Sequence, residues 1–484
     1  MKRIISAILA IVMVLSMMTT EMFSFSATAA TSLSGTCGNN LEWNYSNGVL
    51  EISGTGEMKN YSTNKYLNFY ITDAPWEEFY QTLKTVIINS GVTSIGNNAF
   101  YNCYYITSIS IPDSVTNIGT DAFCGCANSL SSIKIDENNK TYHSAVNCII
   151  ETASNTLIAG CKSSVIPNYI TKIGDYAFYN CSNLPTYDFS IASSVEEIGN
   201  YAFQNCSSLI SIYLPNIVKI GVSAFENCSA LNYITISDIA ELDYNVFNGT
   251  GYYNNSKNWT DNVLYIGKHL IKANSLSGDY SITSGTKRIA PNAFSGCSGL
   301  TSITIPTSVI NIGKQAFYNC NGLTSVTIPD DVVSIGIRAF YNCSGLKNIT
   351  MGKRVDFVGE DAFCGCSNLE KVNTTGSYVY TSFANQEANP LYYAKKLYQN
   401  NSLVTELYVH SSRIGNYALA RCQSVKKIVF YEGLKEIGFG AFLYCSEITD
   451  ITIRDLAGWC NIVFKSSDSN PLQYADNVYL YSGG

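Results

Sequence analysis

A gapless repeat of 23 residues constrains this chain more than any other feature of its sequence. Three copies follow one another from Leu300 to Asn368: LTSITIPTSVINIGKQAFYNCNG, LTSVTIPDDVVSIGIRAFYNCSG and LKNITMGKRVDFVGEDAFCGCSN. A fixed period of about 20 to 50 residues is typical of a solenoid, in which each repeat packs only against its neighbours. The sequence therefore predicts a repeat solenoid, rich in β-strand, with about 23 residues per rung.

Within one copy, the spacing of apolar residues predicts the local structure. The L-x-x-I-x-I pattern from Leu300 indicates a short strand whose alternate residues face solvent, and Pro306 ends it because proline donates no ladder hydrogen bond. A second apolar pair precedes a turn at Gly313, and the spacing of the A-F-x-x-C segment suits one short helical turn. The expected core positions are Leu300, Ile303, Ile305, Val309, Ile312, Ala316, Phe317 and Cys320.

One copy alone cannot be stable. Burial of these side chains contributes about 2 kcal/mol each, or about 15 kcal/mol in total, whereas ordering the backbone costs about 1–2 kcal/mol per residue. Stacking doubles the burial and pairs the strand edges, so stability is expected to belong to the array.

Twelve repeat ends are visible along the chain. Two of them are degenerate, Val246-Phe247 and Ala418-Leu419, and Thr250 stands where the first of these should have cysteine. The ten regular ends begin at Ala99, Ala122, Ala177, Ala202, Ala224, Ala293, Ala316, Ala339, Ala362 and Ala441. The solenoid is predicted to span residues 83–454.

Eleven of the 17 cysteines occupy the same repeat position. We expect them to stack in an inward column as small apolar side chains and to be free thiols, although neighbouring rungs are close enough for occasional disulfides. No cysteine spacing indicates a zinc site. The column consists of Cys103, Cys126, Cys181, Cys206, Cys228, Cys297, Cys320, Cys343, Cys366, Cys422 and Cys445.

The first 30 residues have the pattern of a secretory signal peptide. Lys2 and Arg3 precede an apolar run from Ile4 to Met18, and cleavage is expected after Ala29 or Ala30. The alternative is an uncleaved anchor helix. No later apolar run is long enough to span a membrane, so we expect a protein that is secreted or located at the cell surface.

Residues 31–82 are predicted to cap the first rung. Two alternating segments, Leu41–Tyr45 and Val49–Ile52, flank Asn47-Gly48, a strong signal for a β-hairpin turn. Trp43 and Trp76 are expected in the core of this cap rather than in a ligand site.

Three inserts interrupt the period, near residues 137–168, 251–286 and 374–402. The first two have hairpin-like patterns, and in the first Cys148 is expected opposite Cys161, which makes this pair the candidate disulfide. Asn389-Pro390-Leu391 in the third insert recurs as Asn470-Pro471-Leu472, so residues 455–484 are predicted to form a partial accessory module.

The sequence offers no catalytic set. His143, His269 and His410 are isolated, and hydrolase elbow and phosphate-binding motifs are missing. We expect no enzymatic activity, no cofactor and no metal site. The net charge of −7, with only 14% charged residues, argues against nucleic acid as a partner.

A binding surface is therefore the expected functional feature. The outward positions of the repeat strands are serine and threonine in the central rungs but change to larger residues elsewhere, and tyrosine and arginine are favoured in recognition surfaces. Asn348, Lys371 and Arg454 are among these larger residues. The candidate ligand-binding residues are Tyr408, His410, Lys427 and Tyr431, which form the main patch, together with Tyr213 and Tyr233.

The motif L-x-x-I-x-I-P-x-x-V-x-x-I-G-x-x-A-F-x-x-C, as it stands from Leu300 to Cys320, resembles the BspA-like leucine-rich repeat proteins. The resemblance covers nearly all of residues 31–484. It implies a right-handed solenoid with a sheet on one side, in an exported bacterial protein that adheres to other cells or to extracellular matrix. It implies no particular binding residue.

Three functions remain open at this point. The first is adhesion to, or recognition of, an extracellular protein or glycan at the bacterial cell surface. The second is capture of glycans in support of polysaccharide breakdown, and the third is a structural surface spacer. An exposed row of coplanar tyrosines would favour a glycan, a patch of mixed tyrosine, lysine and histidine a protein, and uniform serine and threonine the spacer.

Overall fold

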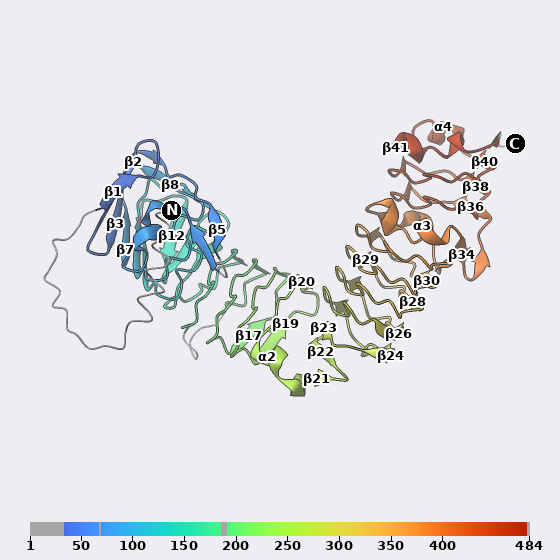
Figure 1. The fold of residues 1–484 in the computed structure, drawn as a ribbon. Coiled ribbons are helices and arrows are strands. Elements are labelled where there is room, and N and C mark those ends of the chain that lie inside the picture. Colours follow the sequence, from blue (N-terminus) through green and yellow to red (C-terminus); the bar gives the residue numbers. More distant parts are fainter. Residues whose placement is uncertain (1–32, 67–68, 185–190, 482–484) are drawn as a thin grey trace, which may run out of the picture.

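The protein is described by a computed structural model of residues 33–66, 69–184 and 191–481. The expected signal peptide, residues 1–30, lies outside the described residues. The chain winds into a β-solenoid of about 17 turns, which bends into an arch (Figure 1). The predicted repeat solenoid is thus confirmed, and it has more turns than the twelve repeat ends visible in the sequence.

The longer strands follow the outer side of the arch, where β26, β28, β30, β36 and β38 lie in Figure 1. The repeat strands pair in parallel; in β28 and β30, for example, Val326 lies opposite Ile349. The first two sheets of this series contain β1 (Leu33–Thr36), β2 (Leu41–Ser46), β3 (Val49–Gly54), β7 (Thr85–Ile88), β9 (Ser108–Ile111) and β11 (Ser132–Ile135), then β17 (Ser211–Leu214) and β19 (Tyr233–Ile236). The next contains β24 (Ser277–Ser281), β26 (Gly299–Thr304), β28 (Ser325–Thr327), β30 (Asn348–Met351), β32 (Lys371–Thr374), β34 (Leu397–Gln399) and β35 (Ser402–Leu403). The last contains β36 (Glu406–Val409), β38 (Lys427–Phe430), β40 (Asp450–Ile453) and β42 (Asn477–Leu480).

Shorter strands follow the inner side of the arch, where β20, β29 and β41 lie in Figure 1. The first two sheets of this series contain β4 (Gly56–Glu57), β8 (Val92–Ile95) and β10 (Asn117–Ile118), then β12 (Tyr142–Ala145), β13 (Cys148–Glu151), β14 (Thr156–Ala159), β15 (Lys172–Ile173), β16 (Glu197–Ile198), β18 (Lys219–Ile220) and β20 (Glu241–Leu242). The next contains β21 (Trp259–Thr260), β22 (Val263–Ile266), β23 (His269–Ala273), β25 (Arg288–Ile289), β27 (Asn311–Ile312), β29 (Ser334–Ile335), β31 (Phe357–Val358) and β33 (Ser382–Phe383). The last contains β37 (Arg413–Ile414), β39 (Glu436–Ile437) and β41 (Val463–Phe464).

Helical segments are short. The α-helical turns are α2 (Gly251–Asn254), α3 (Leu391–Ala394) and α4 (Leu456–Trp459). The 3-10 turns are η1 (Pro75–Phe79), η2 (Ser256–Asn258), η3 (Tyr378–Tyr380), η4 (Gln386–Ala388), η5 (Ser467–Ser469) and η6 (Pro471–Gln473). A separate antiparallel hairpin is made by β5 (Thr63–Tyr66) and β6 (Phe69–Thr72).

The A-F-x-x-C segment, expected as a helical turn, is instead a series of β-turns. Gln315 and Asn319 have φ angles of +55° and +59°, a left-handed conformation that interrupts any right-handed helix. The N–H groups of Gln315, Phe317 and Asn319 therefore donate to the next rung, over 2.7–2.8 Å. Their acceptors are the carbonyl oxygens of Ile337, Ala339 and Tyr341. The turns thus form a third hydrogen-bonded ladder beside the two sheet series.

All eight expected core positions of the first copy are buried. The phenylalanines stack in a column: the ring centroids of Phe317 and Phe340 are 4.9 Å apart, with 5° between the ring planes. The cysteines form the predicted inward column beside them. The Sγ of Cys320 donates to the carbonyl oxygen of Phe294 in the preceding rung over 3.2 Å, and Cys343 repeats this contact with Phe317 over 3.1 Å.

The first rungs are preceded by the predicted hairpin. Strands β2 and β3 pair antiparallel through a turn in which Asn47 and Gly48 both have positive φ. Strand β3 then pairs in parallel with β7, which joins the hairpin to the repeat strands. Trp43 and Trp76 are buried in the same apolar cluster, as expected.

The first two inserts also contain the predicted hairpins and lie within the inner sheet series. Strands β13 and β14 are antiparallel, and β14 pairs in parallel with β15. The candidate disulfide between Cys148 and Cys161 is not made: both residues are buried free thiols. Glu151 pairs with Thr156, so the hairpin turn is centred one residue earlier than expected, and the bulge between Ile149 and Ile150 corrects this shift only in part; the register therefore does not place Cys148 opposite Cys161.

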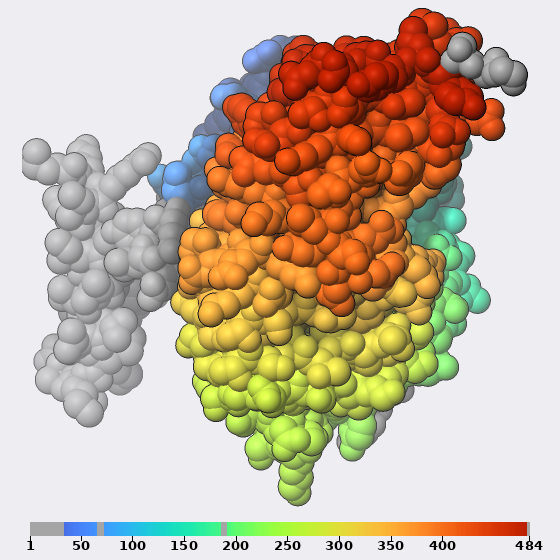
Figure 2. Space-filling view, turned by 90° about the vertical axis from the view of Figure 1, so that its right-hand side faces the viewer, coloured from blue at the N-terminus to red at the C-terminus, as the bar shows by residue number. Residues whose placement is uncertain are grey.

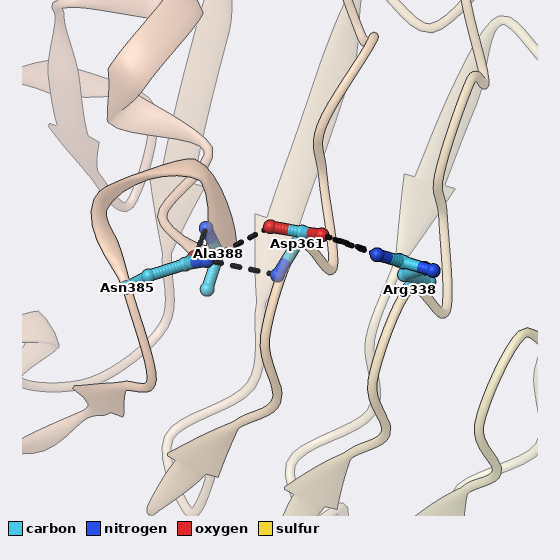
Figure 3. A network of polar contacts seen from close by, with 4 residues as sticks. All are labelled: Arg338, Asp361, Asn385 and Ala388. Atoms are coloured by element: carbon cyan, nitrogen blue, oxygen red, sulfur yellow. Dashed lines mark hydrogen bonds and ion pairs between the residues drawn. The ribbon is translucent and has the colours of Figure 1, made fainter.

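The two Asn-Pro-Leu segments close the turn ladder in equivalent ways. The hydroxyl of Tyr393 accepts a hydrogen bond from the N–H of Gly365 (2.7 Å), and that of Tyr474 accepts one from the equivalent N–H of Tyr444 (3.2 Å). Figure 3 shows the neighbouring contact in the first segment, where the Asn385 amide donates to Asp361 Oδ1 over 2.8 Å. Side chains thus replace the rung that would otherwise continue the ladder.

Candidate functional site

The four strands β36, β38, β40 and β42 bring most of the predicted site residues together. The strands are parallel, and each outward-facing residue is paired with the outward-facing residue at the equivalent position of the next strand. These side chains therefore form rows across the sheet. The first row contains Glu406, Lys427, Asp450 and Asn477. The second contains Tyr408, Val429, Thr452 and Tyr479. A third row lies just beyond the strand ends.

The third row is a continuous stack of aromatic and cationic side chains. The rings of His410 and Tyr431 stack with centroids 3.9 Å apart. The guanidinium carbon of Arg454 lies 4.6 Å from the centroid of Tyr431 and 4.9 Å from that of Tyr481. Arg454 is therefore held between two tyrosine rings, each of which attracts its charge.

Arg454 makes no ion pair with any residue that the structure describes. Its side chain is also exposed. The edge of the guanidinium can therefore donate two parallel hydrogen bonds to a carboxylate from another molecule.

The charged groups of the first row are already paired. The Tyr408 hydroxyl donates to Glu406 Oε2 over 2.9 Å, and Lys427 Nζ lies 3.3 Å from Glu406 Oε1. The hydrogen bond from Tyr408 and the Lys427 charge hold the pKa of Glu406 below its ordinary value. Asp450 accepts hydrogen bonds from Thr449 and Asn477, and these lower the pKa of Asp450. The row thus presents alternating charges in defined positions.

The central rungs present a different face. Ser325 and Thr327 stand at the equivalent positions of β28, and Asn348 and Thr350 at those of β30. Figure 2 views the outer side of the arch and shows these rungs and the last sheet on one continuous surface. The large aromatic and charged side chains therefore distinguish the last sheet from the plain rungs beside it.

The structure separates the two remaining predicted residues from this patch. Tyr213 and Tyr233 lie on β17 and β19, near the base of the arch in Figure 1. They are 64% and 70% exposed. Their register places Tyr213 beside Thr235 and Tyr233 beside Ser211, so the two tyrosines are diagonal neighbours rather than a direct pair. They form a second, smaller patch.

Lys371, another of the larger outward residues, lies on β32 among the central rungs. Its Nζ donates to Asn401 Oδ1 over 2.9 Å and lies 4.7 Å from the ring centroid of Tyr398. Its polar contacts are therefore made within the protein, and it does not belong to either patch.

Sequence reasoning missed Glu406, Asp450, Tyr479 and Tyr481 as members of the main patch. The sequence did contain a signal for them: each residue occupies an outward-facing repeat position equivalent to that of a predicted residue on a neighbouring rung. The repeat length changes between these rungs, so the alignment that reveals the rows was not obvious without the pairing of the strands.

The described residues include no group of three or more His, Cys, Asp or Glu side chains arranged to hold a metal ion. His143 contacts Thr152 and Tyr169, each over 3.0 Å, and His269 contacts the backbone of Ser237. The three histidines are thus in different environments. None of the helices in the described part of the chain is long and apolar enough to cross a membrane.

Several solved structures are similar to this chain. A leucine-rich repeat protein from Eubacterium ventriosum is 22% identical, with 87% of this chain and 90% of that chain covered and a TM-score of 0.28. One from Bacteroides ovatus is 21% identical, with 88% and 98% covered and a TM-score of 0.27. A leucine rich cell surface protein from Faecalibacterium prausnitzii is 21% identical, with 91% and 100% covered and a TM-score of 0.26.

Among proteins of curated function, none matches this sequence. The family model described as BspA type leucine rich repeat region (6 copies) matches residues 75–149, 158–277, 264–387 and 394–474. These segments include most of the chain and nearly all of its rungs. The chain therefore belongs to the BspA-type leucine-rich repeat family.

Proposed function

We propose that this chain is a non-enzymatic recognition protein that binds an extracellular protein through the exposed face of β36, β38, β40 and β42. We call this face the C-terminal sheet face; it consists of the three rows defined above. Its role would be adhesion or recognition at the bacterial cell surface, after export directed by residues 1–30. The description of one similar structure as a cell surface protein agrees with this location.

The observation that carries the proposal is the stack of His410, Tyr431, Arg454 and Tyr481. Aromatic and arginine side chains supply most of the binding energy in protein interfaces, especially where they are rigid before binding. Arg454 lies between two rings, is exposed and makes no ion pair with a described residue, so it can pair with a carboxylate of a partner. The preferred ligand is therefore a protein surface that offers a carboxylate beside apolar groups.

The alternating charges of the first row favour the same class of ligand. Across the sheet, the side-chain charges alternate: Glu406 is negative, Lys427 is positive and Asp450 is negative. Such a pattern selects a complementary pattern of charge and disfavours a uniformly acidic or basic partner. Mixed tyrosine, lysine and histidine side chains are also the composition that favours a protein over a glycan.

The test is a binding screen of residues 31–484 against a panel of extracellular-matrix proteins, with Tyr431→Ala and Arg454→Ala measured separately. We expect each substitution to weaken binding about tenfold or more, because truncated interface anchors cost at least about 2 kcal/mol. Arg354→Ala is the matched control, because Arg354 is an exposed arginine whose contact, an ion pair with Asp331 (3.1 Å), lies on another rung.

Binding that survives both substitutions would move the site away from the C-terminal sheet face, with Tyr213 and Tyr233 next to be tested. Loss of binding in the control as well would indicate a general effect on the fold. Failure to bind any panel protein would favour the structural spacer.

Glycan capture has one observation in its favour. Tyr318 and Tyr341 stack on neighbouring turns with ring centroids 5.2 Å apart and 6° between the planes. Coplanar aromatic rings are suited to the faces of sugar rings, although these two are half-buried. A glycan array, with Tyr341→Ala as the discriminating variant, tests this second candidate separately from the sheet face.

A further inference from the structure

The turn ladder is open at the first insert. In the rung before it, the N–H groups of Asn98 and Phe100 donate to carbonyl oxygens of the next turn, over 3.0 and 2.8 Å. The equivalent N–H groups of that next turn belong to Asp121, Phe123 and Gly125, and they have no acceptor among the residues that the structure describes. The hairpin of β13 and β14 follows instead of a regular turn, so three backbone donors remain at the end of the ladder.

Other ends of the turn ladder are closed or lack space. Before the Asn-Pro-Leu segment at residues 389–391, Asn385 Oδ1 accepts from the N–H of Asp361 and the Tyr393 hydroxyl accepts from that of Gly365. At the second insert, the N–H of Phe247 also has no acceptor in the described part of the chain, but the cavity beside it measures only about 50 Å³. Such a space has room for little more than water. The first insert is therefore the open end that can accommodate a ligand.

A cavity of about 330 Å³ lies at this open end. Its lining runs from Ile118 to Cys124, and so includes Asp121 and Phe123, whose N–H groups are unpaired. The insert and the next rung complete the lining with residues that include Ile158, Lys172, Asp175 and Tyr176. The volume is close to the lower limit of about 300 Å³ for small-molecule pockets, so it suits one amino-acid residue rather than a long segment.

The unpaired charge in the cavity is negative. Lys172 already forms an ion pair with Glu197, with 3.2 Å between the charged atoms. Asp121 and Asp175 form no ion pair with any residue that the structure describes. Asp121 is also half-buried, which makes its charge unfavourable unless a cation lies nearby. The cavity is therefore complementary to a group that is positively charged and also offers a hydrogen-bond acceptor.

We propose that this cavity binds a lysine or arginine residue in an extended peptide segment of a partner protein. A peptide carbonyl oxygen would accept from the N–H of Phe123, in place of the missing turn, and the cationic side chain would lie beside Asp121 and Asp175. Polypeptide backbone is the natural acceptor for this ladder, because each regular turn receives its hydrogen bonds on carbonyl oxygens. An anionic ligand would meet two carboxylates.

The site lies in the N-terminal arm of the arch, near β12, whereas the C-terminal sheet face lies in the other arm (Figure 1). It therefore does not depend on the function proposed for that face.

The test is calorimetric titration of residues 31–484 with the blocked tripeptide acetyl-Ser-Lys-Ser-amide. We expect the tripeptide to bind, and Asp121→Asn to weaken binding about tenfold or more because it removes a charge-assisted contact. Asp361→Asn is the matched control. Asp361 occupies the same repeat position, but Asn385 closes the ladder there, so binding should stay within about twofold of the unchanged protein.

Two further probes separate the parts of the proposal. Acetyl-Ser-Glu-Ser-amide keeps the peptide backbone and reverses the charge, and butylamine keeps a cation without any carbonyl group. We expect each to bind about tenfold or more weakly than the lysine tripeptide. Hydrogen exchange with mass spectrometry should also show slower exchange within residues 121–125 when the lysine tripeptide is bound, because the N–H of Phe123 gains an acceptor.

Several results would overturn the proposal: no binding of the lysine tripeptide, or equal binding by the protein with Asp121→Asn. Equal binding of butylamine would assign the cavity to a small cation, and equal binding of the glutamate tripeptide would show that the carboxylates do not select the ligand. Asp175→Asn provides a second variant, expected to weaken binding as well, in case thermal melting shows that Asp121→Asn impairs folding.

Discussion

At the scale of single residues, the column cysteines have a role that burial alone does not explain. Each thiol of Cys206, Cys228 and Cys366 donates to the carbonyl oxygen of the phenylalanine one rung earlier, over 3.0–3.2 Å. Burial also raises the pKa of these thiols, to about 12 for Cys228 and Cys366. Cysteine thus combines the volume of a small apolar residue with one weak donor, which neither alanine nor a disulfide would supply.

Asp121 occupies a repeat position where asparagine stands in other rungs, as at Asn98 and Asn292. All three have the left-handed φ that asparagine and aspartate tolerate best. Asp121 lines a cavity of about 330 Å³ together with Asp175. Burial, with a smaller effect from the Asp175 charge, raises the pKa of Asp121 from 3.8 to about 6. The ionised carboxylate is therefore unfavourable in the folded protein.

We expect Asp121→Asn to stabilise the protein above pH 6 by about 1 kcal/mol, a value reduced from the full pKa shift because the site is partly solvated. A raised carboxyl pKa means that the unchanged protein loses stability as the pH rises from about 4 to 6. The advantage of the variant should therefore disappear near pH 4. Urea unfolding at several pH values measures it; an equal advantage at all pH values would show that the Asp121 charge is not the cause.

At the scale of elements, the Asn-Pro-Leu segments show how a solenoid tolerates an irregular rung. In the rung before each Asn-Pro-Leu segment, the N–H groups of the A-F-x-x-C turns still find hydrogen-bond acceptors, although the segment itself has no regular turn of this kind. Asn385 Oδ1 accepts from the N–H of Asp361 (3.3 Å), and Ser466 Oγ accepts from the equivalent N–H of Gly440 (3.1 Å). Because the same positions supply the acceptors in both segments, we infer that they are copies of one structural unit.

Removing the Tyr393 hydroxyl by Tyr393→Phe should leave the N–H of Gly365 without its acceptor. An unsatisfied donor costs about 1–3 kcal/mol when fully buried; Gly365 is half-buried, so we expect a cost near the lower end of this range, which makes local opening easier. We expect the Gly365 amide to exchange with solvent deuterium about tenfold faster, as measured by hydrogen exchange with mass spectrometry. Tyr392→Phe is the matched control, since the neighbouring ring contacts Arg421 through its face and would keep that contact. Equal acceleration in both variants would contradict this role of Tyr393.

At the scale of the whole molecule, the core is divided into three apolar clusters rather than one. They extend over Cys37–Cys161, Ala127–Ala290 and Val263–Trp459. The clusters overlap in sequence only at residues 127–161 and 263–290, each of which overlaps one of the first two inserts. Since each rung contacts only its neighbours, weak continuity at these inserts divides the cooperative unit.

We therefore expect unfolding in more than one step, with boundaries near residues 127–161 and 263–290. Hydrogen exchange at increasing urea concentrations should show groups of amides that lose protection together within each cluster. Gly336→Ala should lower protection in the third cluster alone, because its added Cβ would lie 2.5 Å from the Lys314 backbone nitrogen. Gly433→Ala is a control for backbone strain without a steric clash, since Gly433 has a φ of +92° but no atom lies within 4 Å of the added Cβ. Loss of protection across the whole chain in one transition would contradict three units.

The three scales also differ in how well the sequence predicts them. The rung and its core follow from the sequence alone, because burial depends on local spacing: Leu300, Phe317 and Cys320 are buried as their pattern requires. The hairpins at Asn47-Gly48 and in the first two inserts are equally local. The helical turn at Ala316 was wrong because its amides bond to the next rung, and the spacing within one copy does not show this competition.

What only the tertiary structure decided is the alignment of one rung with another. The exact position of the turn between β13 and β14 displaced the expected partner of Cys148, and unequal rung lengths concealed that Arg454 lies between Tyr431 and Tyr481. The 23-residue repeat thus determined the solenoid and its core, since apolar spacing acts within each rung. The proposed binding surface lies where rungs differ, because there the contacts between distant residues depend on register.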